Sequence, residues 1–587
     1  MSEDQARGLS RRGFLKGTAA VSLGTAATAA GITPGGLPVA AAEPSAIPPH
    51  GAELRGLDLV TQSPTAEGRF GFMFKSQPPH GASADLLTPL GQAMKEQPAI
   101  DPATGITKDD NDRFNENPSA TLTSGFTFVG QFVDHDITFD RTPVDQVESD
   151  PYATKNFRSP RYDLDAVYGE GPTVDTQLYN SADRDKFQIE TRGYTSIGTI
   201  KTAQEYVYDV PRAAYDPNDP IRKAKAAIAD PRNDQTLIIL QLHVAMQMFH
   251  NKLVDYMRKI GVPRASVFES ARRLARWHYQ WMVTHEFLPA IVGDATAKSV
   301  YEEVPTGAPK INIKFYRPTN SEQRPFIPVE FSVAAYRFGH SITRPRYTVR
   351  DIKDSTGKVA GTVSSVPLFE AGPTENNLNG GRLVPPRLKM QWSKFFNDPG
   401  VSPKTARPVR QFDASLGDPL SSLPSSALPD TVIKENSLAV RNLHRGKLVG
   451  LPSGQQVAQL MGETPLTDDE LSQNHRIEIE WPIVDNNVIA KRRFTEDNPS
   501  VATALSNMGG EAPLWFYILK EAEVRGRGET LGPVGGRIVA EVLVGLLQRD
   551  LNSYLYLQPT WKPGPPVTPV RGRCNMSDIL KFAGVWS

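Results

Sequence analysis

The sequence predicts a mainly α-helical protein with long connecting loops. Apolar residues recur at helical spacing in several long segments, whereas convincing alternating strands are few and short. The 587 residues include 49 prolines and 46 glycines, which favour long irregular connections over tight turns. Length alone suggests several domains, and a hydrophobic content of 39% is enough for a large core.

The expected helices follow from the spacing of their apolar residues. The clearest stripes predict helices over 234–258 and 267–288. Residues 127–138 also fit a helix, in which Phe128 and Phe132 stack one turn apart. Residues 141–232 are predicted to be mostly loop. Weaker helical signals recur in four later segments, 330–341, 453–461, 514–523 and 533–549.

The first 42 residues have the pattern of an export signal rather than of a folded domain. Arg11 and Arg12 precede a weakly apolar run of small residues, which ends in Ala40-Ala41-Ala42. This order predicts a twin-arginine signal over 1–42 with an A-x-A cleavage site, read by the twin-arginine export machinery. The mature protein is then periplasmic or extracellular. The alternative is a basic tail followed by an alanine-rich linker.

Residues 43–118 are polar and rich in proline and glycine, and we expect them to form an N-terminal arm or wrap. The 65 basic and 65 acidic residues give a net charge of zero, which speaks against nucleic acid or an anionic membrane as partner. A small molecule is the expected partner. Cys574 is the sole cysteine, so no intramolecular disulfide can form. No later stretch of about 18 apolar residues occurs, so no transmembrane segment is expected.

Asp134, His135 and Asp136 place three ionisable groups side by side in an apolar segment. Successive helical residues are rotated by about 100°, so the two carboxylates would point to nearly opposite sides with the imidazole between them. They cannot share one proton, and each needs its own partner because burial without one is costly. For His135 alone, a satisfied core histidine is a more common role than a catalyst.

An oxygen-rich stretch downstream supplies a partner for Asp136. Ser159, Arg161, Asp163 and Asp165 are spaced by two, so in an extended loop they project to one side. With Asp136 they would offer three carboxylates plus hydroxyl and backbone oxygens, a set that suits calcium. The stretch lacks the glycine and terminal glutamate of an EF-hand, and a solvated acidic loop is the alternative.

Several motifs together resemble the animal-type haem peroxidase family, whose members include myeloperoxidase, lactoperoxidase and bacterial relatives. They are Gln131, Asp134-His135-Asp136, the loop 159–165 followed by Ala166-Val167-Tyr168-Gly169, Arg232, Tyr336-Arg337-Phe338-Gly339-His340 and Asn442-Leu443-His444-Arg445. They keep the family's order from about residue 65 to about residue 560. The resemblance implies a bacterial exported member with a mainly helical single domain over 119–587 around haem b.

The resemblance also implies a role for each motif residue. His340 matches the proximal ligand of the haem iron, with Asn442 accepting its other ring N–H. Arg337 and Arg445 match partners of the haem propionates. On the other haem face, His135 matches the general base that takes a proton from hydrogen peroxide. Two further residues match groups beside it, namely Arg232, which stabilises developing charge, and Gln131, which binds water or halide.

The implied activity is reduction of hydrogen peroxide with oxidation of a small donor, and the chain departs from its mammalian relatives in one region. Where those carry a glutamate ester and a methionine sulfonium link to haem, this chain has Gln235 and Thr236, which form neither. Asp134 matches the remaining ester-forming aspartate, so at most one ester link is expected. Loss of the electron-withdrawing sulfonium should lower the haem potential, which favours bromide, iodide, thiocyanate or phenols over chloride.

Two alternatives belong to the same fold. Fatty-acid oxygenases of the superfamily carry a radical tyrosine three residues before the proximal histidine, where this chain has Arg337. Tyr336 is one step further and would be rotated about 100° away in a helix. The other alternative is a secreted adhesion protein without the chemistry. It is disfavoured by the intact site residues, His135, Arg232, His340 and Asn442.

Overall fold

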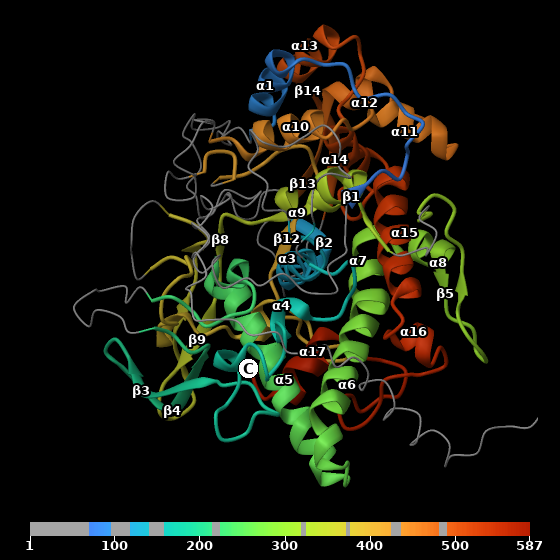
Figure 1. Cartoon of the computed structure of the whole chain (residues 1–587). Helices are drawn as coiled ribbons and strands as arrows, with labels where there is room; N and C mark the ends of the chain where they lie inside the picture. Colours follow the sequence, from blue (N-terminus) through green and yellow to red (C-terminus); the bar gives the residue numbers. More distant parts are fainter. Residues whose placement is uncertain are drawn as a thin grey trace, which may run out of the picture. The chain divides into compact units, whose positions relative to one another are not determined.

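Helices make up most of the regular structure in the described part of the chain (Figure 1). The structure is a computed structural model that describes residues 70–95, 118–139, 156, 158–213, 224–318, 325–370, 376–418, 420–423, 436–479 and 490–587. The export signal expected at 1–42 lies outside these residues, as does most of the arm expected at 43–118. The described part of that arm includes a helix, α1 (Ala84–Ala93), which packs against a later helix, α10 (Leu438–Leu448).

Two of the three longest helices of the described residues are α5 (Leu237–Lys259) and α6 (Val267–Met282). The other α-helices are α3 (Gly125–Ile137), α4 (Asp165–Tyr168), α7 (Leu288–Val292), α8 (Asp294–Val300), α9 (Gly339–Ile342), α11 (Gly454–Met461), α12 (Asp468–Ser472), α13 (Pro499–Asn507), α14 (Leu514–Val524), α15 (Pro533–Arg549), α16 (Tyr554–Leu557) and α17 (Met576–Ala583). The predicted segments 453–461, 514–523 and 533–549 therefore match α11, α14 and α15 closely.

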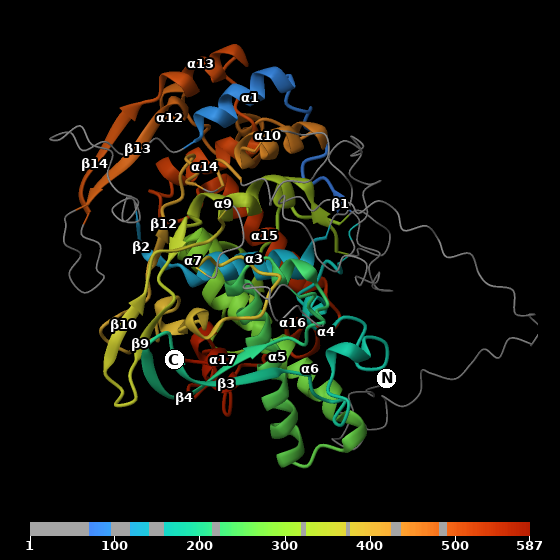
Figure 2. The same ribbon diagram turned by 90° about the vertical axis from the view of Figure 1, so that its left-hand side faces the viewer.

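Helix α3 lies in the middle of the described part, with α10 and α14 on one side and α5 and α6 on the other (Figures 1 and 2). Ten of its thirteen residues are buried. At its start, a Cβ on Gly125 would lie 2.4 Å from the ring of Phe396, so only glycine allows this close approach. Thr138 ends the helix and donates through Oγ1 to the carbonyl of Asp134.

The strands are short and occur only as two-stranded sheets within the described residues. They pair as β1 (Phe70–Gly71) with β7 (Ile327–Pro328), β2 (Pro118–Thr123) with β12 (Pro408–Arg410), β3 (Glu190–Ile197) with β4 (Ile200–Asp209), β5 (Tyr301–Glu302) with β6 (Lys310–Ile311), β8 (Arg346–Tyr347) with β11 (Val366–Pro367), β9 (Arg350–Lys353) with β10 (Val359–Val363) and β13 (Gln473–Ile479) with β14 (Ala490–Asp497). The predicted mainly helical class with few short strands is confirmed.

Three segments differ from the sequence-based expectation. The region 141–232, predicted to be mostly loop, contains the β3–β4 hairpin, which closes through a two-residue turn after Ile197. The helix expected over 267–288 contains a π-helical turn, η6 (Val283–Phe287), before α7 continues it to Val292. The segment expected as one helix over 330–341 is instead a succession of a π-helix (Glu330–Ala334), a 3₁₀ turn (Ala335–Phe338) and α9.

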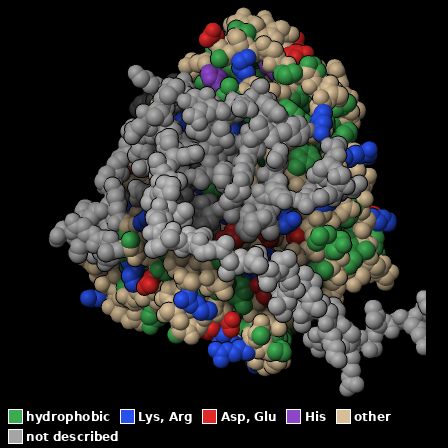
Figure 3. Space-filling model, in the orientation of Figure 1, with side chains coloured by type: hydrophobic (Ala, Val, Ile, Leu, Met, Phe, Trp, Pro, Cys, Tyr) green, Lys and Arg blue, Asp and Glu red, His purple; other side chains and the backbone are tan. Residues whose placement is uncertain are grey.

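The surface agrees with a chain of zero net charge. On the face drawn in Figure 3, Lys and Arg side chains are interspersed with Asp and Glu side chains over the described residues. None of the helices in the described part combines the length and the hydropathy that a membrane span needs.

Candidate active site

A large cavity of about 1500 Å³, including its open mouth, lies between α3 and the segment 330–342. We call it the central cavity. Most of its walls are apolar, including the rings of Phe128 and Phe338. Six residues expected at the site from the sequence line it together, although they come from four separate chain segments: Gln131, Asp134, Arg232, Arg337, His340 and Arg445. The structure thus gathers most of the predicted haem site around one space.

His340 lies in α9 on the wall that faces α3. The amide of Asn442 contacts it, as expected, but with the opposite polarity. Asn442 Nδ2 lies 2.9 Å from His340 Nδ1, and Asn442 Oδ1 accepts a hydrogen bond from Arg337. A guanidinium can only donate, so it takes the amide oxygen and leaves the amide nitrogen for the imidazole. The expected contact between Asn442 and His340 is thus present, and ligation of iron by His340 Nε2 would need the amide turned so that Oδ1 accepts from Nδ1.

Tyr336 also lines the central cavity, contrary to the expected rotation of this residue away from it. The expectation assumed a regular α-helix, whereas Tyr336 lies in the 3₁₀ turn after a π-helix, where the angle between residues differs. Its hydroxyl donates to the carbonyl of Gly130 on α3 across 3.3 Å. Its ring stacks on Phe331, with 4.6 Å between the ring centroids.

His135 is fully buried and points toward the turn η4 (Pro231–Asp234), so its ring is not among the side chains that line the central cavity. Its Nδ1 lies 2.8 Å from Asn233 Oδ1, an oxygen that only accepts, and this contact fits the tautomer with the proton on Nδ1. Burial, followed by the positive charge of Arg232, lowers the pKa of His135 to about 3. The ring is therefore neutral at ordinary pH, and its other nitrogen, Nε2, holds the lone pair.

A buried carboxylate behind the same wall holds Arg232 in place. Its Nε and Nη2 donate to the two oxygens of Asp230 at 3.0 and 2.8 Å, and Nη2 also donates to the carbonyl of His135 at 2.8 Å. Arg158 donates to Asp230 as well, at 2.7 and 2.9 Å. Burial alone would raise the pKa of Asp230, but the charges of Arg232 and Arg158 lower it below its usual value. The predicted arginine is thus next to His135, and its orientation depends on Asp230.

Gln131 and Gln235 face each other on the wall of the central cavity. Gln131 Nε2 lies 3.5 Å from Gln235 Oε1, across 104 residues of sequence. Gln235 is the residue expected, from the resemblance given above, to stand in place of a haem-linked glutamate. It still contributes a polar group to the site, although it cannot form an ester.

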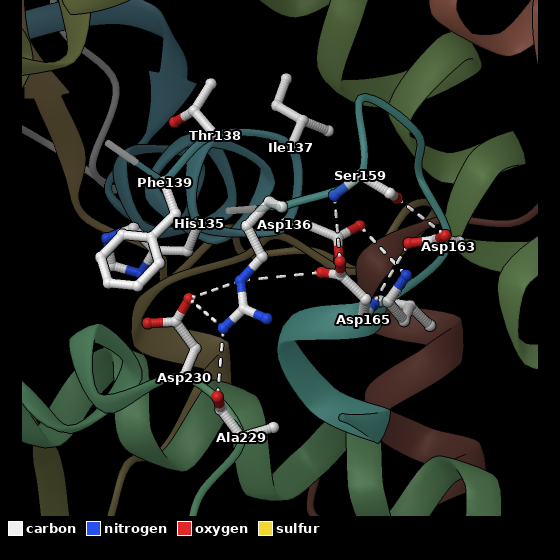
Figure 4. A network of polar contacts seen from close by, with 12 residues as sticks. His135, Asp136, Ile137, Thr138, Phe139, Ser159, Asp163, Asp165, Ala229 and Asp230 are labelled. Atoms are coloured by element: carbon white, nitrogen blue, oxygen red, sulfur yellow. Dashed lines mark hydrogen bonds and ion pairs between the residues drawn. The ribbon is translucent and has the colours of Figure 1, made fainter. Parts of the chain in front are cut away.

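The acidic groups expected to hold a cation come together on the side of α3 opposite Asp134. Carboxylate oxygens of Asp136, Asp163 and Asp165 all lie within 4.8 Å of one another. We call these three residues the carboxylate cluster. Ser159 donates through Oγ to Asp163 and through its backbone N–H to Asp165, at 2.8 and 3.1 Å, as Figure 4 shows. Arg161 lies in the same turn, where its N–H donates to the carbonyl of Ser159.

The carboxylate cluster concentrates negative charge in a buried place. Burial, followed by the charges of Asp165 and Asp163, raises the pKa of Asp136 well above its usual value. Burial also raises the pKa of Asp165 to about 7, against the opposing charge of Arg158, whose Nε lies 3.7 Å from Asp165 Oδ1. Leu164 between the two aspartates has a left-handed backbone with φ of 59°, unusual for leucine, and its N–H donates to Asp136. This donor set fits a hard divalent cation.

The family described as "Animal haem peroxidase" matches residues 139–473, more than half of the chain. The chain belongs to the animal haem peroxidase family. The matched segment contains Arg232, His340 and Asn442, whereas α3 with His135 precedes it. The geometry of α3 is therefore an observation independent of the family match.

Two relatives of this peroxidase family have similar sequences. The chain is 25% identical over 382 residues to chorion peroxidase from Drosophila melanogaster, covering 63% of this chain and 40% of that protein. It is 27% identical over 234 residues to a peroxidase-like protein from Margaritifera margaritifera, covering 38% of this chain and 26% of that protein. The chain thus spans less than half the length of the curated relatives it matches.

Solved structures share the fold at lower identity. Peroxidase A from Dictyostelium discoideum superposes with a TM-score of 0.53 at 13% identity, covering 93% of this chain and 98% of that one. The fatty acid alpha-dioxygenase from Arabidopsis thaliana superposes with a TM-score of 0.51 at 12% identity, covering 86% of this chain and 74% of that one. The chain thus shares its fold with a peroxidase and with a fatty acid alpha-dioxygenase.

The family implies haem, and the central cavity fits it. Its walls are mostly apolar, as the faces of a haem require. His340 on one wall would supply a nitrogen ligand to its iron, and Arg337 and Arg445 would supply two cations for its propionates. Asp134 lines the cavity with Oδ1 accepting from Thr138 at 2.9 Å, so the aspartate expected to form an ester reaches this space.

Three residues of the site escaped the sequence analysis: Arg158, Asp230 and Asn233. Asp230 carried a weak signal, since it stands two residues before Arg232, a spacing that lets a carboxylate cap a turn and meet the guanidinium. The structure has this arrangement, with Asp230 also accepting from the backbone N–H of Arg232. Arg158 and Asn233 had no signal, because their partners come from distant parts of the chain.

Proposed function

We propose that this chain is a haem-dependent peroxidase that reduces hydrogen peroxide and oxidises a small halide, thiocyanate or phenolic donor. The observation that carries the proposal is the central cavity, with His340 on one wall and α3 on the other. Peroxide cleavage requires one histidine that binds the haem iron and, on the other side of the haem, a neutral histidine that can accept a proton. His340 and His135 would be these two residues. The family membership supports the same reaction.

The side chains of α3 and η4 would move the proton. His135 Nε2 holds a lone pair, so it can accept a proton from peroxide and return it to the leaving oxygen. Peroxide must reach the buried ring between Gln131 and Asp134, the side chains of α3 that border it on the cavity wall. Haem bound at His340 would supply the redox chemistry.

Arg232 would stabilise negative charge as the oxygen–oxygen bond breaks. Arg232 lines the central cavity and its guanidinium is oriented beforehand by Asp230, so little reorganisation would accompany the reaction. Gln131 and Gln235 would bind water or the donor through their amides. With glutamine and threonine at 235 and 236, the haem lacks two of the links of mammalian enzymes, which favours donors easier to oxidise than chloride.

The test is an absorption spectrum of the haem-supplemented protein during titration with hydrogen peroxide, followed by extraction with acid acetone. A Soret band that changes with stoichiometric peroxide supports the function, and a chain that never acquires a Soret band would instead favour the adhesion protein. Haem that extracts freely would rule out the ester through Asp134. Turnover with bromide, iodide, thiocyanate and a phenol ranks the donors.

One observation favours a second candidate, the fatty-acid oxygenase. Tyr336 lines the central cavity and its hydroxyl reaches α3. The peroxidase remains preferred, because the position three residues before His340 is Arg337, whose guanidinium is bound to Asn442. Incubation with linoleic acid under air and under nitrogen separates the two: uptake of dioxygen into the lipid without added peroxide would reverse the order, and Tyr336→Phe should then abolish it.

Two further parts of the proposal concern the setting of the enzyme. The twin-arginine pattern at 1–42 supports export of the folded protein to the periplasm or the exterior, which fractionation of a cell that expresses the full chain would test. The carboxylate cluster supports binding of one calcium ion beside α3. Elemental analysis of the purified protein would test this second part directly.

A further inference from the structure

A second cavity of about 730 Å³, including its open mouth, lies between β4, α5 and the residues that follow α17. We call it the aromatic pocket, because two tyrosines and two tryptophans line it: Tyr206, Tyr208, Trp392 and Trp586. It shares no lining residue with the central cavity. The end of the chain lies beside β4 and α17 in both ribbon views (Figures 1 and 2). The described residues therefore offer a second place at which a small molecule can bind.

The aromatic pocket combines a buried ring with an exposed one. Gln241 on α5 accepts from the backbone N–H of Met390 and donates to the carbonyl of Leu388, both at 2.9 Å, which fixes this segment to α5. Trp392 follows two residues after Met390 and is only 2% exposed. Tyr206 on β4 is 46% exposed, so its ring is accessible to a ligand. A flat aromatic molecule is the ligand that such walls favour.

A lysine adds a positive charge to these aromatic walls. Lys389 Nζ lies 3.1 Å from Glu205 Oε2, and Arg350 Nη2 donates to both oxygens of the same carboxylate, at 2.9 and 3.0 Å. Two cations thus share one carboxylate. Of the two, Lys389 lines the aromatic pocket, with 24% of its side chain exposed. Its ammonium group can therefore bind the carboxylate of an aromatic acid.

A continuous series of aromatic rings joins the aromatic pocket to the central cavity. Trp392 packs on Phe395 with 5.8 Å between the ring centroids. Phe395 packs in turn on Tyr347 at 6.2 Å and on Phe128 at 6.3 Å, and Tyr347 meets Phe128 edge-on at 5.3 Å. All four rings are buried, and Phe128 lines the central cavity. The two cavities are thus connected through side chains in contact.

Two members of this series can lose an electron. An indole or phenol ring is oxidised far more easily than a phenyl ring, so Trp392 and Tyr347 can carry an electron vacancy while the two phenylalanines fill the space around them. Trp392 is also the member that lines the aromatic pocket. A donor bound there would contact the oxidisable ring directly, without entering the central cavity.

We propose that the aromatic pocket binds a phenolic acid and that Trp392 passes its electron toward the central cavity. This inference deepens the proposed function and rests on it, because peroxide must take up the electrons there. Each phenol loses one electron and its hydroxyl proton and becomes a phenoxyl radical. Two such donors supply the two electrons and two protons with which one hydrogen peroxide, its oxygen–oxygen bond broken, becomes two molecules of water.

Binding can be measured without peroxide. Calorimetric titration of the haem-loaded full chain with 4-hydroxycinnamate should show one site per chain, with no change in the Soret band. Tyr206→Ser and Lys389→Met should each weaken this binding by roughly 10-fold, the order expected from the loss of one aromatic or charged contact. Tyr556→Ser is the matched control, because Tyr556 is an exposed tyrosine that lines neither cavity. Absence of binding, or equal binding by all three variants, would overturn the site.

Trp392→Phe tests the electron route, because it keeps an aromatic ring in the core and removes the oxidisable indole. We expect most of the turnover of 4-hydroxycinnamate relative to that of iodide to be lost, while the binding of 4-hydroxycinnamate is kept. Electron paramagnetic resonance after mixing with peroxide alone should show a tryptophan radical that Trp392→Phe lacks. Trp561→Phe is the control, since Trp561 is outside the series of rings and should keep the signal. The same radical in both variants would contradict the route.

The inference and the proposed function can fail separately. A haem-loaded chain that binds 4-hydroxycinnamate but does not react with peroxide would end the proposed function and the electron route, while the binding site stands. A chain that oxidises iodide and 4-hydroxycinnamate in a ratio that Tyr206→Ser, Lys389→Met and Trp392→Phe all leave unchanged would remain a peroxidase. The aromatic pocket would then not be its donor site.

Discussion

On the α3 side of the central cavity, His135 stands on a regular helix and a buried carboxylate holds the neighbouring Arg232. On the opposite side, His340 stands on an irregular segment and its contact is a neutral amide. His135 and Arg232 are tied to Asn233 and Asp230, all of them buried. His340 meets Asn442 at the junction of a 3₁₀ turn with α9. The proposed function assigns proton transfer to the first side and the binding of haem to the second.

The largest expected effect is on the His340 wall. His340→Ala removes the nitrogen ligand, so we expect loss of the haem Soret band or of its ligation, and with it all peroxidase turnover. The measurement is the absorption spectrum after haem supplementation. His444→Ala is the matched control, because His444 Nε2 contacts Thr88 at 3.0 Å instead of the central cavity. Equal haem binding by both variants would contradict the assignment of the ligand.

The opposite wall should respond differently to the equivalent change. His135→Ala should keep bound haem, since His135 lies behind the wall opposite His340, but it should slow peroxide cleavage by about 10²- to 10⁴-fold through loss of the base. Stopped-flow mixing with peroxide measures this rate. An unchanged rate in this variant would show that His135 is not the base. The two sides of the cavity would then not differ in function as proposed.

Asp230 tests whether charge pairing holds the α3 wall. Asp230→Asn leaves Arg158 and Arg232 without their shared carboxylate in a buried place, which should destabilise the fold by about 3–5 kcal/mol. Asp183→Asn breaks an exposed pair with Arg258 and should cost less than about 1 kcal/mol. Denaturant unfolding compares the two variants. Similar losses of unfolding free energy in the two variants would mean that the buried network contributes little to stability.

The smallest expected effect comes from the carboxylate cluster. The pKa of Asp165, about 7 in the fold, lies above its ordinary value, so the folded chain binds more protons than the unfolded one. Without a cation, stability should therefore fall as pH rises from about 4 through 7. Calcium replaces these protons, so its stabilisation should grow over the same range, reaching about 2.7 kcal/mol at a hundred times its Kd.

Thermal unfolding with calcium and with chelator, at several pH values, measures this gain. Asp163→Asn should reduce it, because the variant has one carboxylate fewer in the cluster. A calcium gain that is the same at pH 5 and at pH 8 would disagree with displacement of protons from the carboxylate cluster.

The same contrast explains how much of the molecule could be predicted. Residues 127–138 form a regular amphipathic helix, so the expected span agrees with α3 within two residues. The segment 330–342 was expected to be a helix as well, but its hydrogen bonds change from π to 3₁₀ to α spacing, and no sequence periodicity reports such changes. The prediction that Tyr336 is rotated away from the cavity was therefore wrong. The position of His340 at the cavity was expected from its sequence motif and did not depend on the helix type.

The β3–β4 hairpin was missed although its sequence contains a turn signal. Gly198 has φ of 56° at the first position of the two-residue turn, the conformation that glycine adopts most easily. Its strands are largely exposed, so no apolar alternation marked them. Contacts between distant segments, such as the one between Arg158 and Asp230, cannot be predicted from the sequence pattern before the fold is known.

Arg158 touches both Asp230, which orients Arg232, and Asp165, which belongs to the carboxylate cluster. One positive charge therefore balances two sites with different tasks. Among homologous chains, a neutral residue at the position of Asp165 would leave Arg158 with one partner fewer. We expect substitutions at these positions to be correlated in evolution, so that chains which abandon the cation site also replace the arginine.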